Sequence, residues 1–222
     1  MDDTNFLPND PTECHALLLA AFQQAKQLEQ RAAEAERRAA ESEQRVAELG
    51  MPAVALTDQS NMFALVRFYK AAMAVGIKPI GGVDAWVRNA DDANKPDRLV
   101  LLVQDARGYR NLTELVSRSY REGQRLERAM MDPDWLTPET TAGLIALSGA
   151  REGDVGRALL SGHRALAEQR LDAWRKLFGD RYYLQLVRTG RSDEEDCLHA
   201  SVELAAAHAV PVVATNGVCF LR

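Results

Sequence analysis

The sequence predicts an α/β fold in which alternating strands and helices build a parallel sheet or barrel. Short apolar runs without polar alternation recur along the chain, as at 99–103 and 144–147, which is typical of strands buried on both faces. Amphipathic stretches with helical spacing separate these runs, as at 108–120 and 195–207. The chain has 222 residues, 46% of them hydrophobic, and this is enough for the core of such a domain.

The first 49 residues differ in composition from the rest. Residues 1–11 are polar and contain two prolines, so we expect a flexible tail. Residues 12–49 are rich in Ala, Glu, Gln and Arg and lack Gly and Pro, which predicts a long helix. Its apolar residues form a heptad seam, mostly alanine in the middle, over about four heptads. Two interpretations stay open: a coiled coil that makes the chain a homodimer, and a single solvated helix.

The next stretch predicts a strand, a helix, a second strand, a turn and a further strand. The first apolar run, 54–56, is followed by polar residues that suit the N-terminus of a helix. Gly76 would end this helix, and a strand would begin at 77–80. Gly81 and Gly82 suit a turn. The residues that we expect on the buried face of the helix are Met62, Leu65, Val66, Tyr69, Ala72 and Met73.

Two aspartates follow predicted strands. Asp58 comes after 54–56, and Asp84 comes after the strand that begins at 77–80. The carboxyl ends of strands are where α/β folds place their chemistry, so both carboxylates are candidate site residues. The alternative for Asp58 is that it only caps the helix that follows.

The rest of the chain continues the alternation of strands and helices. A polar loop at 88–97 precedes the strand 99–103, and the segment 123–141, which contains two prolines, looks irregular. The remaining expected elements are a helix at 108–120, a strand at 144–147, helices at 155–160 and 166–178, a strand at 182–187, a helix at 195–207 and a strand at 211–215.

Charge and composition exclude several classes of protein. The formal net charge is −5, without the clustered Lys and Arg that direct nucleic-acid binding requires. The three cysteines, Cys14, Cys197 and Cys219, are far apart, which favours a reducing cytoplasm over a disulfide framework. No apolar run reaches the length of a membrane span, so we expect a cytoplasmic protein without a membrane anchor.

Ordered motifs in residues 50–222 resemble the PHP domain that opens the alpha subunit of bacterial DNA polymerase III. The resemblance implies a distorted seven-stranded (β/α) barrel. Nothing here is similar to the first family strand with its His-x-His motif, so we expect an incomplete barrel, cut short at its C-terminal end, behind an unrelated helical leader. The motifs that carry the resemblance are Gly50-Met51-Pro52-Ala53, Thr57-Asp58-Gln59, Phe68-Tyr69, Gly76-Ile77-Lys78-Pro79-Ile80, Gly108-Tyr109-Arg110-Asn111-Leu112, Asp134-Trp135-Leu136, Gly153-Asp154-Val155-Gly156-Arg157 and Pro211-Val212-Val213-Ala214-Thr215-Asn216.

The resemblance also implies a trinuclear metal site of phosphoesterase type, which this sequence retains only in part. Gln59 stands where the family has a metal-binding His, and Arg98 stands where it has another. Arg188 and Thr189 occupy the strand end that supplies a further ligand, and the closing Asp-x-His falls on Gly217 and Cys219. The remnants that match are Asp58, Asp84 and Cys219. We therefore expect no metal cofactor, with Zn or Mn as the alternative.

Three functional hypotheses follow. The first is a catalytically degenerate PHP domain that stabilises the polymerase alpha subunit in DNA replication and docks the proofreading exonuclease. The parent family is a DNA-directed DNA polymerase, a nucleotidyltransferase, but its polymerase domain is not in this sequence, so the segment alone is not expected to polymerise DNA. The second is an active metal-dependent phosphoesterase or 3′–5′ exonuclease. The third is an interaction module in which the helix 12–49 binds a partner.

Overall fold

A computed structural model describes residue 26 and residues 50–89, 91–92, 94–125 and 127–215. The chain divides into two compact units, residues 1–50 with Leu221 and residues 51–220 with Arg222. The predicted tail 1–11 and, apart from Lys26, the predicted helix 12–49 lie outside the described residues, so the homodimer seam stays a prediction.

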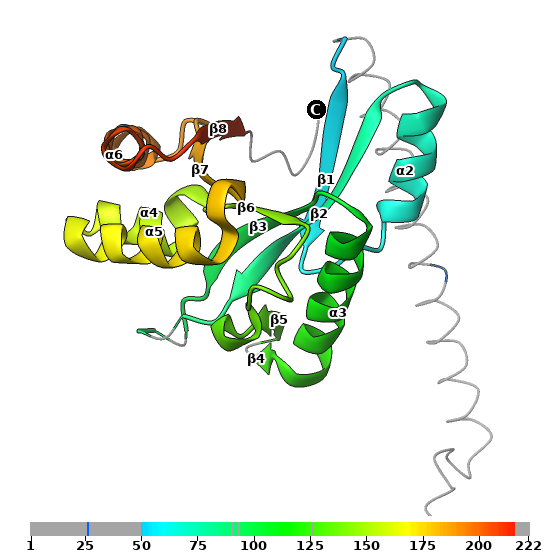
Figure 1. Cartoon of the computed structure of the whole chain (residues 1–222), viewed down its shortest axis with the longest axis horizontal. Coiled ribbons are helices and arrows are strands. Elements are labelled where there is room, and N and C mark those ends of the chain that lie inside the picture. The colour runs from blue at the N-terminus through cyan, green and yellow to red at the C-terminus, as the bar shows by residue number, and fades with distance from the viewer. Residues whose placement is uncertain (1–25, 27–49, 90, 93, 126, 216–222) are drawn as a thin grey trace, which may run out of the picture. The chain divides into compact units, whose positions relative to one another are not determined.

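The second unit is a mixed α/β fold with helices on two sides of one sheet. Figure 1 shows α2 and α3 on one side of the strands and α4, α5 and α6 on the other. The strands are β1 (Ala53–Gln59), β2 (Lys78–Val87), β3 (Asp97–Val103), β4 (Gln124–Arg125), β5 (Arg128–Met131), β6 (Leu144–Leu147), β7 (Tyr182–Val187) and β8 (Val212–Thr215). The helices are α2 (Leu65–Ala74), α3 (Ala106–Glu122), α4 (Asp154–Leu160), α5 (Arg164–Phe178) and α6 (Glu194–His208).

The strand order is β4-β5-β2-β3-β6-β7-β8, and β1 also pairs with β2. β1 and β5 both pair in parallel with β2, along 78–84 and 86–87 respectively. β3 is antiparallel to both of its neighbours, β2 and β6, so the expectation of a purely parallel sheet is wrong at this strand. The reason is the connection between β2 and β3, residues 88–96, which is too short for a crossover helix.

β2 runs without interruption through Gly81 and Gly82, where the sequence suggested a turn. A Cβ atom at Gly82 would lie 2.6 Å from the carbonyl oxygen of Leu101, and one at Gly81 would lie 2.9 Å from Cδ1 of Leu65. The two glycines therefore allow the neighbouring strand and helix to approach β2 closely, which is the usual role of glycine inside a strand.

The segment 123–141, expected to be irregular, contains the short antiparallel pair β4–β5 and a turn of 3-10 helix at Pro133–Trp135. Strands of two and four residues are too short to show an alternating pattern in the sequence.

Only part of the set expected on the inner face of α2 turns inward, and of that set Met62 and Leu65 are half-buried. Ala72 and Phe68 are buried, whereas Val66, Tyr69 and Met73 are exposed. The helix begins without a side-chain cap at Ala64. The reason for the error is that α2 is apolar on two faces, and the sequence pattern cannot say which face meets the sheet.

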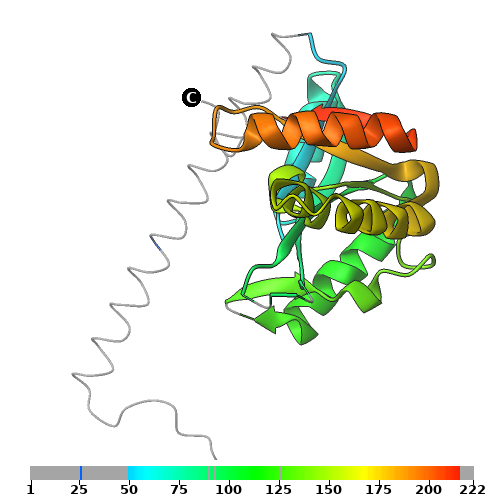
Figure 2. The ribbon, with the colours of Figure 1, turned by 90° about the vertical axis from the view of Figure 1, so that its left-hand side faces the viewer.

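The core lies between the sheet and the helices on both of its sides. In Figure 2, α6 lies beside the pair formed by α4 and α5, and contacts between α4 and both helices join the three. Trp174 of α5 stacks on Tyr182 at the start of β7, and its indole nitrogen donates to the half-buried carboxylate of Asp154. The largest fully buried side chains are Tyr182, Phe178, Leu99, Leu101, Leu112, Met131, Leu144, Leu171, Leu184, Leu204, Val83 and Val155.

Two arginines of α4 and α5 hold the loop before β3. Arg157 donates to the carbonyl oxygens of Lys95 and Pro96 and forms an ion pair of 3.1 Å with Asp97. Arg170 donates to Asp91 and to the carbonyl oxygen of Asp154. Burial raises the pKa of Asp97 to about 6. The negative charges of Asp154 and Asp91 also raise it, whereas the positive charges of the two arginines lower it.

This shift predicts a pH dependence of stability. The folded state holds a proton on Asp97 up to about pH 6, while an unfolded aspartate loses it near pH 4. The contribution of Asp97 to the free energy of unfolding should therefore fall as the pH rises from about 4 to about 6. Urea denaturation over this range should show that decline, and Asp97→Asn should flatten it. An unchanged slope in Asp97→Asn, or an equal change in the exposed control Asp172→Asn, would contradict the assignment.

Candidate functional site

The polar cluster lies where the end of β1 meets the interior of β2, and the register of the two strands builds it. Asp84 lies within β2 and not after it, because the strand continues to Val87. Gln59 is the partner of Asp84, and Asp58 is the partner of Val83. The backbone N–H of Ser60 and the side-chain amide of Gln59 both donate to the carbonyl oxygen of Asp84, at 2.9 and 2.8 Å. These bonds fix the end of β1 against β2.

The two candidate aspartates lie on opposite faces of the sheet. Residues paired across strands share a face, and neighbours along a strand alternate, so Asp84 shares its face with Gln59 and not with Asp58. Burial raises the pKa of Asp58, and a hydrogen bond to the backbone of Ala64, directly before α2, opposes this shift. α2 begins without a side-chain cap, so a capping role for Asp58 stays a prediction.

Arg98 occupies the face that carries Asp84. It is the partner of Trp86, two residues along β2 from Asp84, and so lies diagonally across the strand pair. Its Nε donates to Oδ1 of Asp84 at 3.0 Å, and its Nη2 donates to Oδ2. Its Nη1 donates to Oε2 of Glu152. One guanidinium group therefore bridges two carboxylates, and one of them, Asp84, is only 7% exposed.

The electrostatics of this triad follow from its burial. Burial raises the pKa of Asp84, and the hydrogen bonds and charge of Arg98 oppose this shift. Burial raises the pKa of Glu152 as well, but the nearby charges of Arg98, Arg151 and Arg191 outweigh this effect. The pKa of Glu152 is therefore below its usual value. The pKa of Arg98 is raised because its two carboxylate partners outweigh its own desolvation. A buried charge that keeps bidentate partners in this way stays ionised.

Glu152 is the member of the site that sequence reasoning missed. It lies on a turn of 3-10 helix, Ala150–Glu152, which follows β6. The feature of the local sequence that could have pointed to Glu152 is the pair of glycines that flank this turn, Gly149 and Gly153. Gly149 has a positive φ of 73°, and a Cβ atom there would overlap the carbonyl oxygen of Arg98. Glycine thus lets the turn approach β3 closely enough for Glu152 to reach Arg98.

The strand end at Arg188 and Thr189 supplies no free donor to this cluster. Arg188 is paired with Glu195, with its Nε at 2.5 Å from Oε1. Thr189 donates to Glu194 through both its backbone N–H and its hydroxyl, and the hydroxyl bond, together with backbone donors, lowers the pKa of Glu194 to about 2. Cys219 lies outside the described residues.

The described residues do not fit a Zn or Mn site. Among them, no group of three or more His, Cys, Asp and Glu side chains is close enough to hold a metal ion. Both carboxylate oxygens of Asp84 accept from Arg98, and Gln59 directs its amide nitrogen to a carbonyl oxygen. A site for these metals needs imidazole, thiolate or several carboxylate ligands, and here a cation of the protein holds the carboxylates.

A mixed sheet between two layers of helices, with polar side chains where strands end, places the molecule in a known class of fold. Solved structures with a similar fold include the following two. A protein of Bifidobacterium adolescentis named as a metal-dependent phosphoesterase aligns with a TM-score of 0.53 and 11% identity, over 79% of this chain and 80% of that one. An amidohydrolase from Chromobacterium violaceum aligns with a TM-score of 0.50 and 17% identity, over 80% of each chain. These likenesses show that the described part of the chain shares an α/β fold with both structures.

The chain belongs to the PHP domain family, whose model matches residues 30–189. This match begins inside the predicted helix 12–49. Curated relatives include the DNA polymerase III subunit alpha of Pseudomonas aeruginosa, 51% identical over 174 residues, and that of Escherichia coli K12, 49% identical over 173 residues. Each alignment covers 78% of this chain and 15% of the relative, so the chain is homologous to the PHP domain of those proteins and spans a small part of their length.

In the part of the chain that the structure describes, no helix has both the length and the apolar character needed to cross a membrane.

Proposed function

We propose that this chain is the PHP domain of a replicative DNA polymerase alpha subunit in a form that serves as a cytoplasmic scaffold and not as a phosphoesterase. The observation that carries the proposal is the Arg98 bridge between Asp84 and Glu152. A guanidinium group supplies the positive charge that holds these carboxylates together, so the fold needs no metal ion there. The relatives named as DNA polymerase III subunit alpha supply the context of DNA replication.

The partner that we propose for this scaffold is the proofreading exonuclease subunit of the same bacterium. Binding of the purified full chain to that subunit, measured by surface plasmon resonance, tests the proposal. We expect saturable binding that does not change when EDTA is added, because the scaffold does not depend on a metal ion. Lack of binding up to about 100 μM, the weak end of specific association, would contradict the docking role.

The second candidate is a metal-dependent phosphoesterase or 3′–5′ exonuclease, which one of the solved neighbours favours by its name. Hydrolysis of p-nitrophenyl phosphate and of single-stranded DNA, with Zn²⁺ or Mn²⁺ added, separates it from the scaffold. If the chain is a scaffold, the wild-type protein should hydrolyse neither substrate faster than the Asp84→Ala variant does. Metal-dependent turnover that Asp84→Ala abolishes would establish the second candidate in its place.

A further inference from the structure

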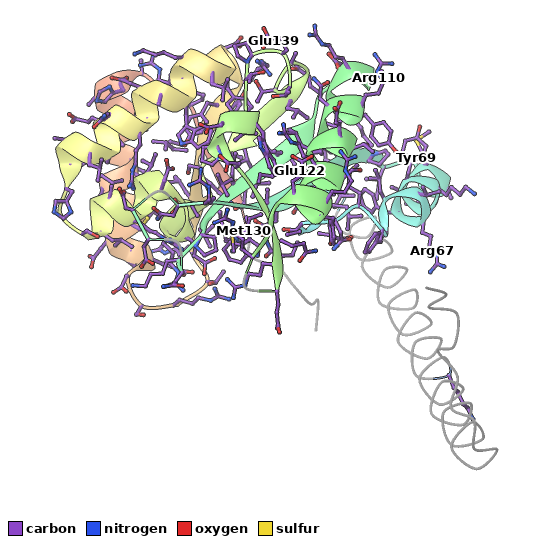
Figure 3. All side chains as sticks on the ribbon, turned by 90° about the horizontal axis from the view of Figure 1, so that it is seen from below. Arg67, Tyr69, Arg110, Glu122, Met130 and Glu139 are labelled. Atoms are coloured by element: carbon purple, nitrogen blue, oxygen red, sulfur yellow. The ribbon has the colours of Figure 1, made fainter. Side chains whose placement is uncertain are left out.

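The outer face of α2 carries apolar side chains that nothing in the described part of the chain covers. Phe63 is 85% exposed, Val66 62%, Tyr69 54% and Met73 56%. These four residues, here called the α2 patch, recur at three- and four-residue steps, so they lie along one side of the helix and its start. Figure 3 shows Tyr69 and Arg67 on α2, at one margin of the described residues within 50–215.

The size and composition of the α2 patch set it apart from other exposed apolar residues. Four large side chains at these exposures add up to several hundred Å², which is the range of the largest and often functional patches on monomeric proteins. On α5 and α6, by contrast, single residues such as Leu166 and Val202 are exposed. A helix that is apolar on two faces is typical of a helix buried on two sides.

The charged residues in the stretch of sequence that contains α2 are all positive, which favours a partner with negative charge. Between Asp58 and Asp84 the sequence has no acidic residue and three cations, Arg67, Lys70 and Lys78, in a chain whose net charge is −5. A second copy of α2 would bring these cations against one another, which disfavours self-association. Three cations are too few for a phosphate-binding surface, and the apolar side chains between them favour a protein partner.

We infer that the α2 patch is a docking site for an amphipathic helix with acidic residues beside its apolar stripe. The apolar stripe of such a helix would cover Val66, Tyr69 and Met73, and its carboxylates would meet Lys70. In this mode of binding, apolar side chains at helical spacing supply the contacts between the two helices. The charged side chains beside them set the orientation and the selectivity.

Two synthetic peptides test this inference on the full chain by fluorescence anisotropy. Both are helices about five turns long with a leucine stripe, flanked by glutamate in one and by lysine in the other. We expect the glutamate peptide to bind at least about tenfold more tightly than the lysine peptide, a difference of about 1.4 kcal/mol. Lys70→Glu should reverse this preference, while Lys176→Glu, an exposed cation on α5, should leave it unchanged.

The apolar contribution is tested by Val66→Ser with Met73→Ser, whose wild-type side chains are exposed and whose loss should not unfold the chain. This variant should weaken binding of the glutamate peptide at least about tenfold, and the matched control Val202→Ser should not. Several outcomes would overturn the inference: no binding of either peptide, binding that survives the patch variant, self-association that the patch variant abolishes, or competition by single-stranded DNA. Circular dichroism of each variant confirms that it is folded.

Discussion

Replacement of Arg98 by alanine is expected to lower the free energy of unfolding by about 3–5 kcal/mol, the cost of leaving buried charges without a partner. The substitution strands the carboxylate of Asp84 in a buried position and removes the partner of Glu152. For a chain of this size the melting temperature should fall by about 10 °C. Thermal and urea denaturation followed by circular dichroism measure both quantities.

Two controls show whether the unpaired charge is the cause. Arg98→Ala combined with Asp84→Ala removes the stranded carboxylate, so the double variant should be more stable than Arg98→Ala alone. Arg164→Ala removes an exposed arginine that pairs with Glu168 in the next turn of α5, and this should cost less than about 1 kcal/mol. If Arg98→Ala were no more harmful than Arg164→Ala, the bridge would have no structural role.

Gly108→Ala is the second substitution from which we expect a large effect. Gly108 is buried in the first turn of α3, and a Cβ atom there would overlap the backbone carbonyl of Gly143. The backbone cannot yield as a flexible side chain would, so α3 must shift away from the loop before β6. We expect a loss of about 3 kcal/mol or more in the free energy of unfolding, at the upper end of overpacking effects.

Gly162→Ala is the matched control for this prediction. Gly162 has open space around it and a φ of 73°, so alanine there meets only backbone strain. That strain should cost about 1 kcal/mol. Equal losses in the two variants would show that the close approach of α3 to Gly143 does not limit the packing. Urea denaturation of both proteins provides the comparison.

The sequence predicts the α/β class and most of the elements because each apolar run is long enough to show its period. The central part of each expected strand from 54–56 to 211–215 is a strand in the structure. The antiparallel direction of β3 could be predicted only from the short 88–96 connection, because its apolar run has the same pattern in either direction. The expected burial of Val66, Tyr69 and Met73 on α2 was wrong because both faces of this helix are apolar.

Within the candidate site, the sequence singles out Asp84 and Arg98, and the structure brings them together, although Asp84 lies inside β2 and not at its end. The sequence could not predict which face of the sheet carries Asp58. Side chains along a strand alternate between the two faces, so a shift of one residue in the register moves Asp58 to the opposite face. Glu152 could not be found, since its contact with Arg98 spans 54 residues of sequence. Only the turn that Gly149 allows brings it into reach.

The measurement that tests the central claim most directly is a thermal melt of the purified chain with and without excess Zn²⁺ or Mn²⁺, with bound metal quantified in the same sample. A ligand at a hundred times its Kd adds about 2.7 kcal/mol to the stability of the native state, which a melt detects. If Arg98 takes the place of a metal ion, the chain should melt cooperatively at the same temperature in both conditions and contain no stoichiometric metal. A raised melting temperature with stoichiometric metal, both lost in Asp84→Ala, would contradict this account.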